Sequence, residues 1–137
     1  MKYFIISLVT LFSLSACKDV KGPQSDALFD QVMGLHDDIM PISTKLHGLQ
    51  TSLKTMLASN DSIPEGVTKE DVLAVSMHTE KAYNDMMDWM RDFKVPENMN
   101  PNDKTAYLQS EKQKLEKMKE ESNAAYNEAI AIVKKHK

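Results

Sequence analysis

The sequence predicts an all-α protein, an up-down-up antiparallel three-helix bundle with coiled-coil spacing. Apolar residues recur at alternating gaps of three and four over three long segments, which is the spacing of a coiled-coil seam. Short loops rich in Pro, Gly, Asn and Asp separate these segments, and short loops between long helices favour antiparallel neighbours. The alternative fold is a two-helix hairpin that dimerises into a larger helical assembly.

Length and charge narrow the class of protein. The chain has 137 residues, of which 27% are charged, and a formal net charge of -3, so we expect one domain after a targeting segment is removed. Lys and Glu are interleaved and leave no basic face, which excludes the charge pattern of a nucleic-acid-binding protein. The single Cys excludes a disulfide framework within the chain.

Residues 1–16 are predicted to be a lipoprotein signal peptide. A positive start at Lys2 precedes an apolar stretch that is too short to span a bilayer. The sequence LSAC at residues 14–17 resembles the lipobox of bacterial lipoproteins. That resemblance implies that Cys17 becomes the first mature residue and carries lipid, which would hold the protein on a membrane. Polar, turn-forming residues follow, so residues 17–24 are expected to be the lipidated Cys and its tether.

The first helix is predicted over residues 25–57, with Ser25 as its N-cap. Its seam residues are Leu28, Val32, Leu35, Ile39, Ile42, Leu46, Leu49, Leu53 and Met56. Pro41 removes one backbone donor inside this helix, and because the apolar register continues on both sides, we expect a kink. Two helices broken at Met40 are the alternative.

The second helix is predicted over residues 68–93, with Thr68 as its N-cap. Its seam residues are Val72, Val75, Thr79, Ala82, Met86, Trp89 and Phe93. Pro96 follows the helix, and Trp89 with Phe93 predicts an aromatic plug at one end of the bundle.

The third helix is predicted over residues 103–136, with Asn102 or Asp103 as its cap. Its seam residues are Leu108, Glu111, Leu115, Met118, Ser122, Ala125, Ala129 and Ile132, of which Glu111 and Ser122 are polar exceptions. The three helices complete a bundle over residues 25–137.

No catalytic motif is visible in the sequence, so no enzymatic activity is expected. A phosphate-binding loop, a nucleophile elbow and a His-Glu-x-x-His pair are all missing from it. The chain does contain ten Met and four His. Core packing without a cofactor is the leading interpretation of the Met residues, because Met fills irregular gaps in cores.

Copper is the alternative interpretation, because thioether and imidazole groups suit Cu(I). If Leu57 at the end of the first helix lies level with Thr68 at the start of the second, His36 lies beside Trp89 and Met90, and Met40 lies beside Met86. The candidate Cu(I) ligands are therefore His36, Met40, Met86 and Met90, with Glu111 as a polar supporting residue. His47, His78 and Met118 form a poorer second cluster.

A partner groove is a further hypothesis. Met33, Met40 and Met87 could line a groove beside the first two helices, where flexible thioethers adapt to the apolar face of a partner helix. The expected partner is another helical envelope protein or a second copy of the chain.

Two further segments carry a family resemblance. The sequences HDDIMP (residues 36–41) and MMDWMRDF (residues 86–93), with the lipobox, resemble small helical lipoproteins of Bacteroidetes-type bacteria, some of which are labelled as similar to viral A-type inclusion protein. The resemblance implies an anchor and a helical body over nearly the whole chain, and it implies no activity. We therefore expect a lipid-anchored protein of the bacterial cell envelope, with the outer membrane favoured, that has a structural or partner-binding role.

Overall fold

The computed structural model describes residues 23–59 and 62–135, which form three helices and no strand. The helices are α1 (Pro23–Ala58), α2 (Lys69–Asp92) and α3 (Pro101–Lys135), and each packs against the other two. The prediction of an all-α three-helix bundle is confirmed. The predicted signal peptide, Cys17 and most of the predicted tether lie outside the described residues.

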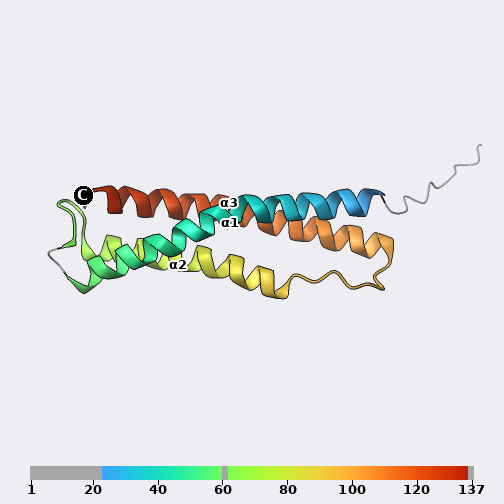
Figure 1. The fold of residues 1–137 in the computed structure, drawn as a ribbon, viewed down its shortest axis with the longest axis horizontal. Coiled ribbons are helices and arrows are strands. Elements are labelled where there is room, and N and C mark those ends of the chain that lie inside the picture. Colours follow the sequence, from blue (N-terminus) through green and yellow to red (C-terminus); the bar gives the residue numbers. More distant parts are fainter. Residues whose placement is uncertain (1–22, 60–61, 136–137) are drawn as a thin grey trace, which may run out of the picture.

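The helices lie side by side along one long axis (Figure 1). Ion pairs join α1 and α3 at two places: Lys104 lies 3.6 Å from Asp26, and Lys119 lies 2.7 Å from Asp38.

α1 begins at Pro23, so the prediction of Ser25 as its N-cap is wrong. Proline suits the first helical position because its φ angle is already helical and its missing N–H has no partner there. Ser25 instead lies inside the first turn, where it is buried.

α1 passes through Pro41 without a break, so the alternative of two helices broken at Met40 is wrong. Its first half follows the long axis and its second half slopes away, and the direction changes near the middle of the helix (Figure 1). Pro41 lies in this region and has no N–H to donate to the carbonyl of Asp37. The Thr44 hydroxyl donates to the carbonyl of Met40 at 3.1 Å.

A reciprocal pair of hydrogen bonds caps α2. The amide of Asp71 donates to the Thr68 hydroxyl at 3.0 Å, and the amide of Thr68 donates to the Asp71 carboxylate at 3.0 Å. This capping box agrees with the predicted start of the helix at Thr68.

The cap of α3 differs from the prediction. The Asn100 side-chain oxygen accepts from the amide of Asp103 at 2.9 Å, and Pro101 is the first helical residue. Asn100 is therefore the capping residue, and the prediction of Asn102 or Asp103 is wrong. The sequence Asn-Pro places the cap directly before a proline, which favours the first helical position.

The buried apolar residues form three clusters along the bundle. The first, near the α2–α3 connection, contains Leu28, Val32, Ile39, Met86, Trp89, Leu108 and Leu115. The middle cluster contains Leu46, Ala82 and Ala125. The last, near the α1–α2 connection, contains Leu53, Met56, Val72, Ala129 and Ile132. The first cluster holds the larger side chains that position the candidate sites.

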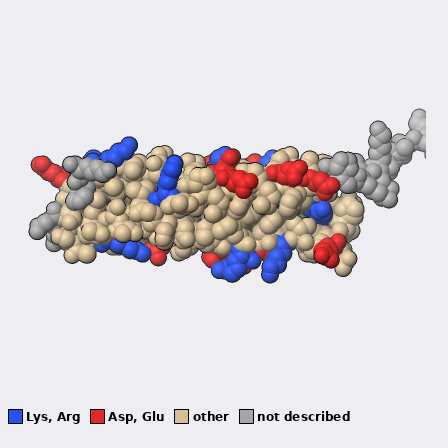
Figure 2. Space-filling view, viewed as in Figure 1, with Lys and Arg blue, Asp and Glu red and all other residues tan. Residues whose placement is uncertain are grey.

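Charge is unevenly distributed on the surface. The first 22 residues of α1 include Asp26, Asp30, Asp37 and Asp38 and no Lys or Arg. Figure 2 shows acidic side chains gathered over this half of α1. In the described part of the chain, no helix has both the length and the apolar character that crossing a membrane requires.

Candidate functional site

α1 and α2 bring the imidazole of His36 against the thioether of Met90. The distance between His36 Nε2 and Met90 Sδ is 3.3 Å, and the His36 ring centroid lies 5.9 Å from that of Trp89. These contacts agree with the predicted helix register, which placed His36 beside Trp89 and Met90.

The second ring nitrogen of His36 faces a carboxylate. The distance between His36 Nδ1 and Asp37 Oδ1 is 2.8 Å. Only 19% of the His36 side chain is exposed, whereas Asp37 lies at the surface. The ring therefore lies between a solvent-facing carboxylate and a thioether at the edge of the core.

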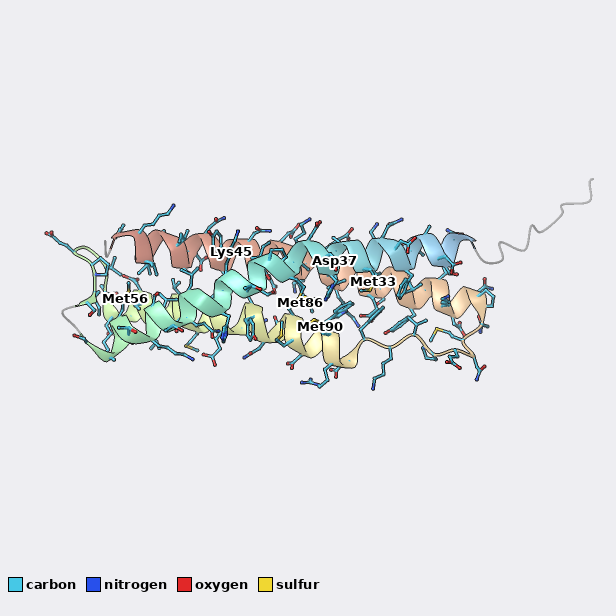
Figure 3. All side chains as sticks on the ribbon, in the orientation of Figure 1. Met33, Asp37, Lys45, Met56, Met86 and Met90 are labelled. Carbon is cyan, nitrogen blue, oxygen red and sulfur yellow. The ribbon has the colours of Figure 1, made fainter. Side chains whose placement is uncertain are left out.

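The Met residues predicted to bind copper or to line a groove include three besides Met90 that belong to the same core region: Met40, Met86 and Met87. Met86 is completely buried in the first cluster, while Met40, Met87 and Met90 are half-buried and pack against it. Figure 3 shows Met86 and Met90 one turn apart on α2. The structure therefore gathers Met40, Met86 and Met90, with His36, in one section of the bundle.

Glu111, the predicted supporting residue, makes its hydrogen bonds to α2 and α3 residues. It is buried between α2 and α3, where Trp89 Nε1 donates to its Oε2 at 2.9 Å. Lys114 Nζ donates to its other oxygen at 2.6 Å. Both oxygens of the carboxylate thus have hydrogen-bond partners.

A small cleft lies between α1 and α2, which we call the α1–α2 cleft. Its volume is about 180 Å³, and its lining residues are Met40, Ser43, Thr44, His47, Tyr83 and Met87. The His47 and Tyr83 rings lie 5.1 Å apart. The cleft joins Met40 and Met87 of the predicted partner groove, but half-buried Met33 does not line it.

A larger cleft of about 460 Å³ lies between α2 and α3, which we call the α2–α3 cleft. Its lining residues are Asp85, Asp88, Trp89, Asp92, Phe93, Tyr107, Glu111, Lys114 and Met118. The aromatic plug predicted from Trp89 and Phe93 is present here: the two rings stack at 4.6 Å, and the Tyr107 ring lies 6.1 Å from Phe93.

The α2–α3 cleft was not predicted from the sequence. The spacing of Asp85, Asp88 and Asp92 beside Trp89 placed carboxylates next to the aromatic side chains, and this was a usable signal. The contribution of Tyr107 depends on the register between α2 and α3, which the spacing alone does not define.

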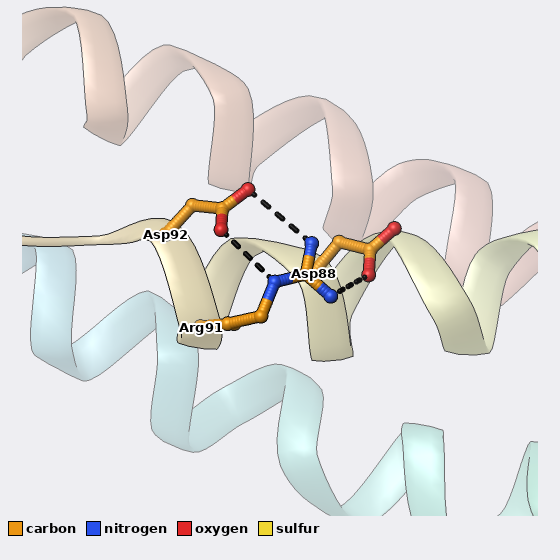
Figure 4. Close-up of polar contacts among 3 residues, drawn as sticks. All are labelled: Asp88, Arg91 and Asp92. Atoms are coloured by element: carbon orange, nitrogen blue, oxygen red, sulfur yellow. Dashed lines mark hydrogen bonds and ion pairs between the residues drawn. The ribbon is translucent and has the colours of Figure 1, made fainter.

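Cations already balance the carboxylates of the α2–α3 cleft. Arg91 donates to Asp88 at 2.8 Å and to Asp92 at 3.1 and 3.4 Å, as Figure 4 shows. Hydrogen bonds to Asp92 and then Asp88 raise the pKa of Arg91, and a hydrogen bond to Asp85 raises the pKa of Lys81. The cleft therefore has paired acidic groups around an aromatic wall.

The second predicted cluster, of His47, His78 and Met118, does not form. His78 Nδ1 lies 2.7 Å from Glu128 Oε2, His47 stacks on Tyr83, and Met118 lines the α2–α3 cleft. Within residues 23–59 and 62–135, no three His, Cys, Asp or Glu side chains come together as a metal-binding group. The His36–Met90 contact is of a different kind, because one donor is a thioether.

The fold and these contacts define an all-α three-helix bundle with two clefts between its helices and a His–Met contact at the edge of its core. No family model matches the chain, and no curated protein and no solved structure matches it.

Proposed function

We propose that this protein is a lipid-anchored helical protein of the bacterial cell envelope that binds a helical partner and has no catalytic activity of its own. The lipobox at Cys17 supports the anchor, and the outer membrane is the favoured location. The partner is another helical envelope protein or a second copy of the chain.

We also propose that the three helices form an up-down-up antiparallel bundle with coiled-coil spacing. Contacts between α1 and α2 support it, because His36 meets Met90 and the later residue His47 meets the earlier residue Tyr83. The regular spacing of apolar residues in all three helices supports the coiled-coil geometry.

The α1–α2 cleft is the observation that carries the partner-binding role. Its volume of about 180 Å³ suits one large apolar side chain. Met40 and Met87 bound it from facing helices, and thioether side chains adapt to apolar groups of different shape. A helix that binds in a groove inserts such anchor side chains at intervals along its apolar face.

Site-specific photo-crosslinking in cells tests this role. A photoreactive residue replaces exposed His47 at the cleft in the full-length chain, and a control chain carries it at exposed Glu120 on α3. We expect a discrete adduct from position 47 only. An adduct of twice the mass of the chain identifies a second copy, and any other discrete mass identifies a different protein.

A charge placed in the cleft should prevent binding, and the same substitution elsewhere on α2 is the matched control. Met87→Asp places a carboxylate against the partner side chain and should abolish the adduct, whereas Met77→Asp, at a Met that is 64% exposed on the same helix, should not. An adduct that survives Met87→Asp, or equal crosslinking from positions 47 and 120, contradicts partner binding at this cleft.

A further inference from the structure

Both ring nitrogens of His36 face groups that offer electron pairs. Nδ1 lies 2.8 Å from a carboxylate oxygen of Asp37, and Nε2 lies 3.3 Å from Sδ of Met90. A neutral imidazole has one N–H, and an ionised carboxylate can only accept a hydrogen bond. If Nδ1 donates to Asp37, the lone pair of Nε2 is directed at the sulfur. The two atoms then present electron pairs on the same side of the contact, which suits a soft metal ion that lies beside the line between them.

The separation of the two atoms suits two ligands of one metal ion. Metal–nitrogen distances of about 2.0 Å and metal–sulfur distances of about 2.3 Å at a tetrahedral angle place the two donor atoms about 3.5 Å apart. The observed distance is 3.3 Å. The pair therefore needs little movement for both atoms to bind one ion that lies beside the line joining them.

The contact between His36 and Asp37 is the kind that orients a metal-binding imidazole. Histidine ligands commonly donate their other N–H to a carboxylate, which selects the tautomer with a free nitrogen toward the metal. Asp37 is in this position beside Nδ1. It is therefore a positioning residue, while His36 and Met90 supply the ligand atoms.

Further thioethers occupy the neighbouring turns of the two helices. Met40 follows His36 by one turn of α1, and Met86 precedes Met90 by one turn of α2, and both belong to the same core region. In Figure 3, Met86 and Met90 lie on α2 near the first half of α1, which carries Met33 and Asp37. Met40 and Met86 are therefore the candidates for a third ligand.

We propose that His36 Nε2 and Met90 Sδ, with the thioether of Met40 or Met86, bind one Cu(I) ion. Thioether and imidazole donors suit Cu(I) better than hard cations such as Mg²⁺ or Ca²⁺, which take oxygen ligands. This metal site goes beyond the partner-binding function.

Anaerobic competition against a chromophoric Cu(I) chelator tests the site. The full-length chain is used in detergent, with Cys17→Ser in every sample so that the thiol does not bind copper. We expect the chain to withdraw one equivalent of Cu(I) from the chelator. Met90→Leu, which retains the apolar volume, should weaken binding by more than about tenfold, because even the loss of an outer-shell partner costs about 10–100-fold.

Met56→Leu is the matched control, because Met56 is 1% exposed and lies in the cluster at the opposite end of the bundle (Figure 3). Its copper affinity should equal that of the parent chain. Methionine methyl NMR of the parent chain gives a second measurement that needs no variant: Cu(I) should shift the Met90 signal and leave the Met56 signal unchanged. No withdrawal of copper, equal losses in both variants, or an unshifted Met90 signal would overturn the proposal.

Discussion

Glu111 is a carboxylate that is 5% exposed at a seam position of α3. A buried charge is costly unless it is paired and hydrogen-bonded, and Glu111 accepts from both Trp89 Nε1 and Lys114 Nζ. These two donors explain why a charged residue occupies a place that the apolar pattern otherwise reserves for the core.

We predict that Glu111→Ala lowers the free energy of unfolding by about 1–3 kcal/mol, because it leaves the buried indole N–H of Trp89 without an acceptor. Glu111→Gln should cost less, since an amide oxygen can still accept from Trp89. Urea unfolding followed by the fluorescence of Trp89, the only Trp in the chain, measures both. Exposed Glu120→Ala is the control and should stay within about 0.5 kcal/mol of wild type. Equal stability of Glu111→Ala and wild type would contradict this role.

The contacts of single residues were only partly predictable. Counting back from the first loop placed His36 beside Met90, because two helices joined by a short loop have a defined register. The partner of Glu111 was not predictable, because it depends on the rotation of α3 about its own axis and on the orientation of the Trp89 indole. Residue types and spacing define neither of these.

At the level of the helices, the cap of α2 makes a contribution to the stability of the folded state that depends on pH. Hydrogen bonds from the Thr68 side chain and then from its backbone amide lower the pKa of Asp71. A carboxylate with a lowered pKa in the folded state stabilises that state above its unfolded pKa, which for Asp is about 3.9. This contribution is lost as the pH falls through the lowered pKa.

We therefore predict that the Tm difference between wild type and Asp71→Asn is largest at neutral pH and shrinks as the pH falls toward 3. Thr68→Ala removes the hydroxyl donor and should show a similarly weakened pH dependence. Thermal melts of the three proteins across this range measure the effect. A Tm difference that stays constant with pH would show that the charge of Asp71 does not act through the cap.

Pro41 leads to a second prediction about a helix. Its side chain is exposed and its backbone cannot donate inside α1, so Pro41→Ala restores a hydrogen bond without removing buried contacts. We expect the free energy of unfolding to rise by about 1–3 kcal/mol. Gly48→Ala, at an open position of the same helix, calibrates the gain from helix propensity alone, about 1 kcal/mol. A loss of stability in Pro41→Ala would mean that the core requires the change of direction in α1.

Across the whole molecule, the apolar pattern predicted where the helices lie in the sequence more accurately than it predicted which residues of each helix are buried. All the seam residues of α3 except half-buried Met118 are buried, including Glu111 and Ser122. In α1, Ser43 and Gln50 are buried instead of Ile42 and Leu49. A helix that packs against two neighbours buries more than one stripe, so polarity alone does not identify its innermost residues.

The two clefts are likewise properties of the assembled bundle. Each depends on how side chains from two helices meet, and the α2–α3 cleft combines residues from distant parts of the chain. The Met and aromatic residues that line the clefts are visible in the sequence. Which of them come together depends on the register and rotation of all three helices.

We propose that a lipid on Cys17 anchors this bundle to a membrane, and the intact mass of the protein, extracted with detergent from bacterial membranes, measures that lipid. We expect a chain that begins at residue 17 and carries the added mass of a lipid. We expect Cys17→Ala to lack this mass and either to leave the membrane fraction or to persist as an uncleaved precursor. A wild-type chain of unmodified mass would rule out the anchor.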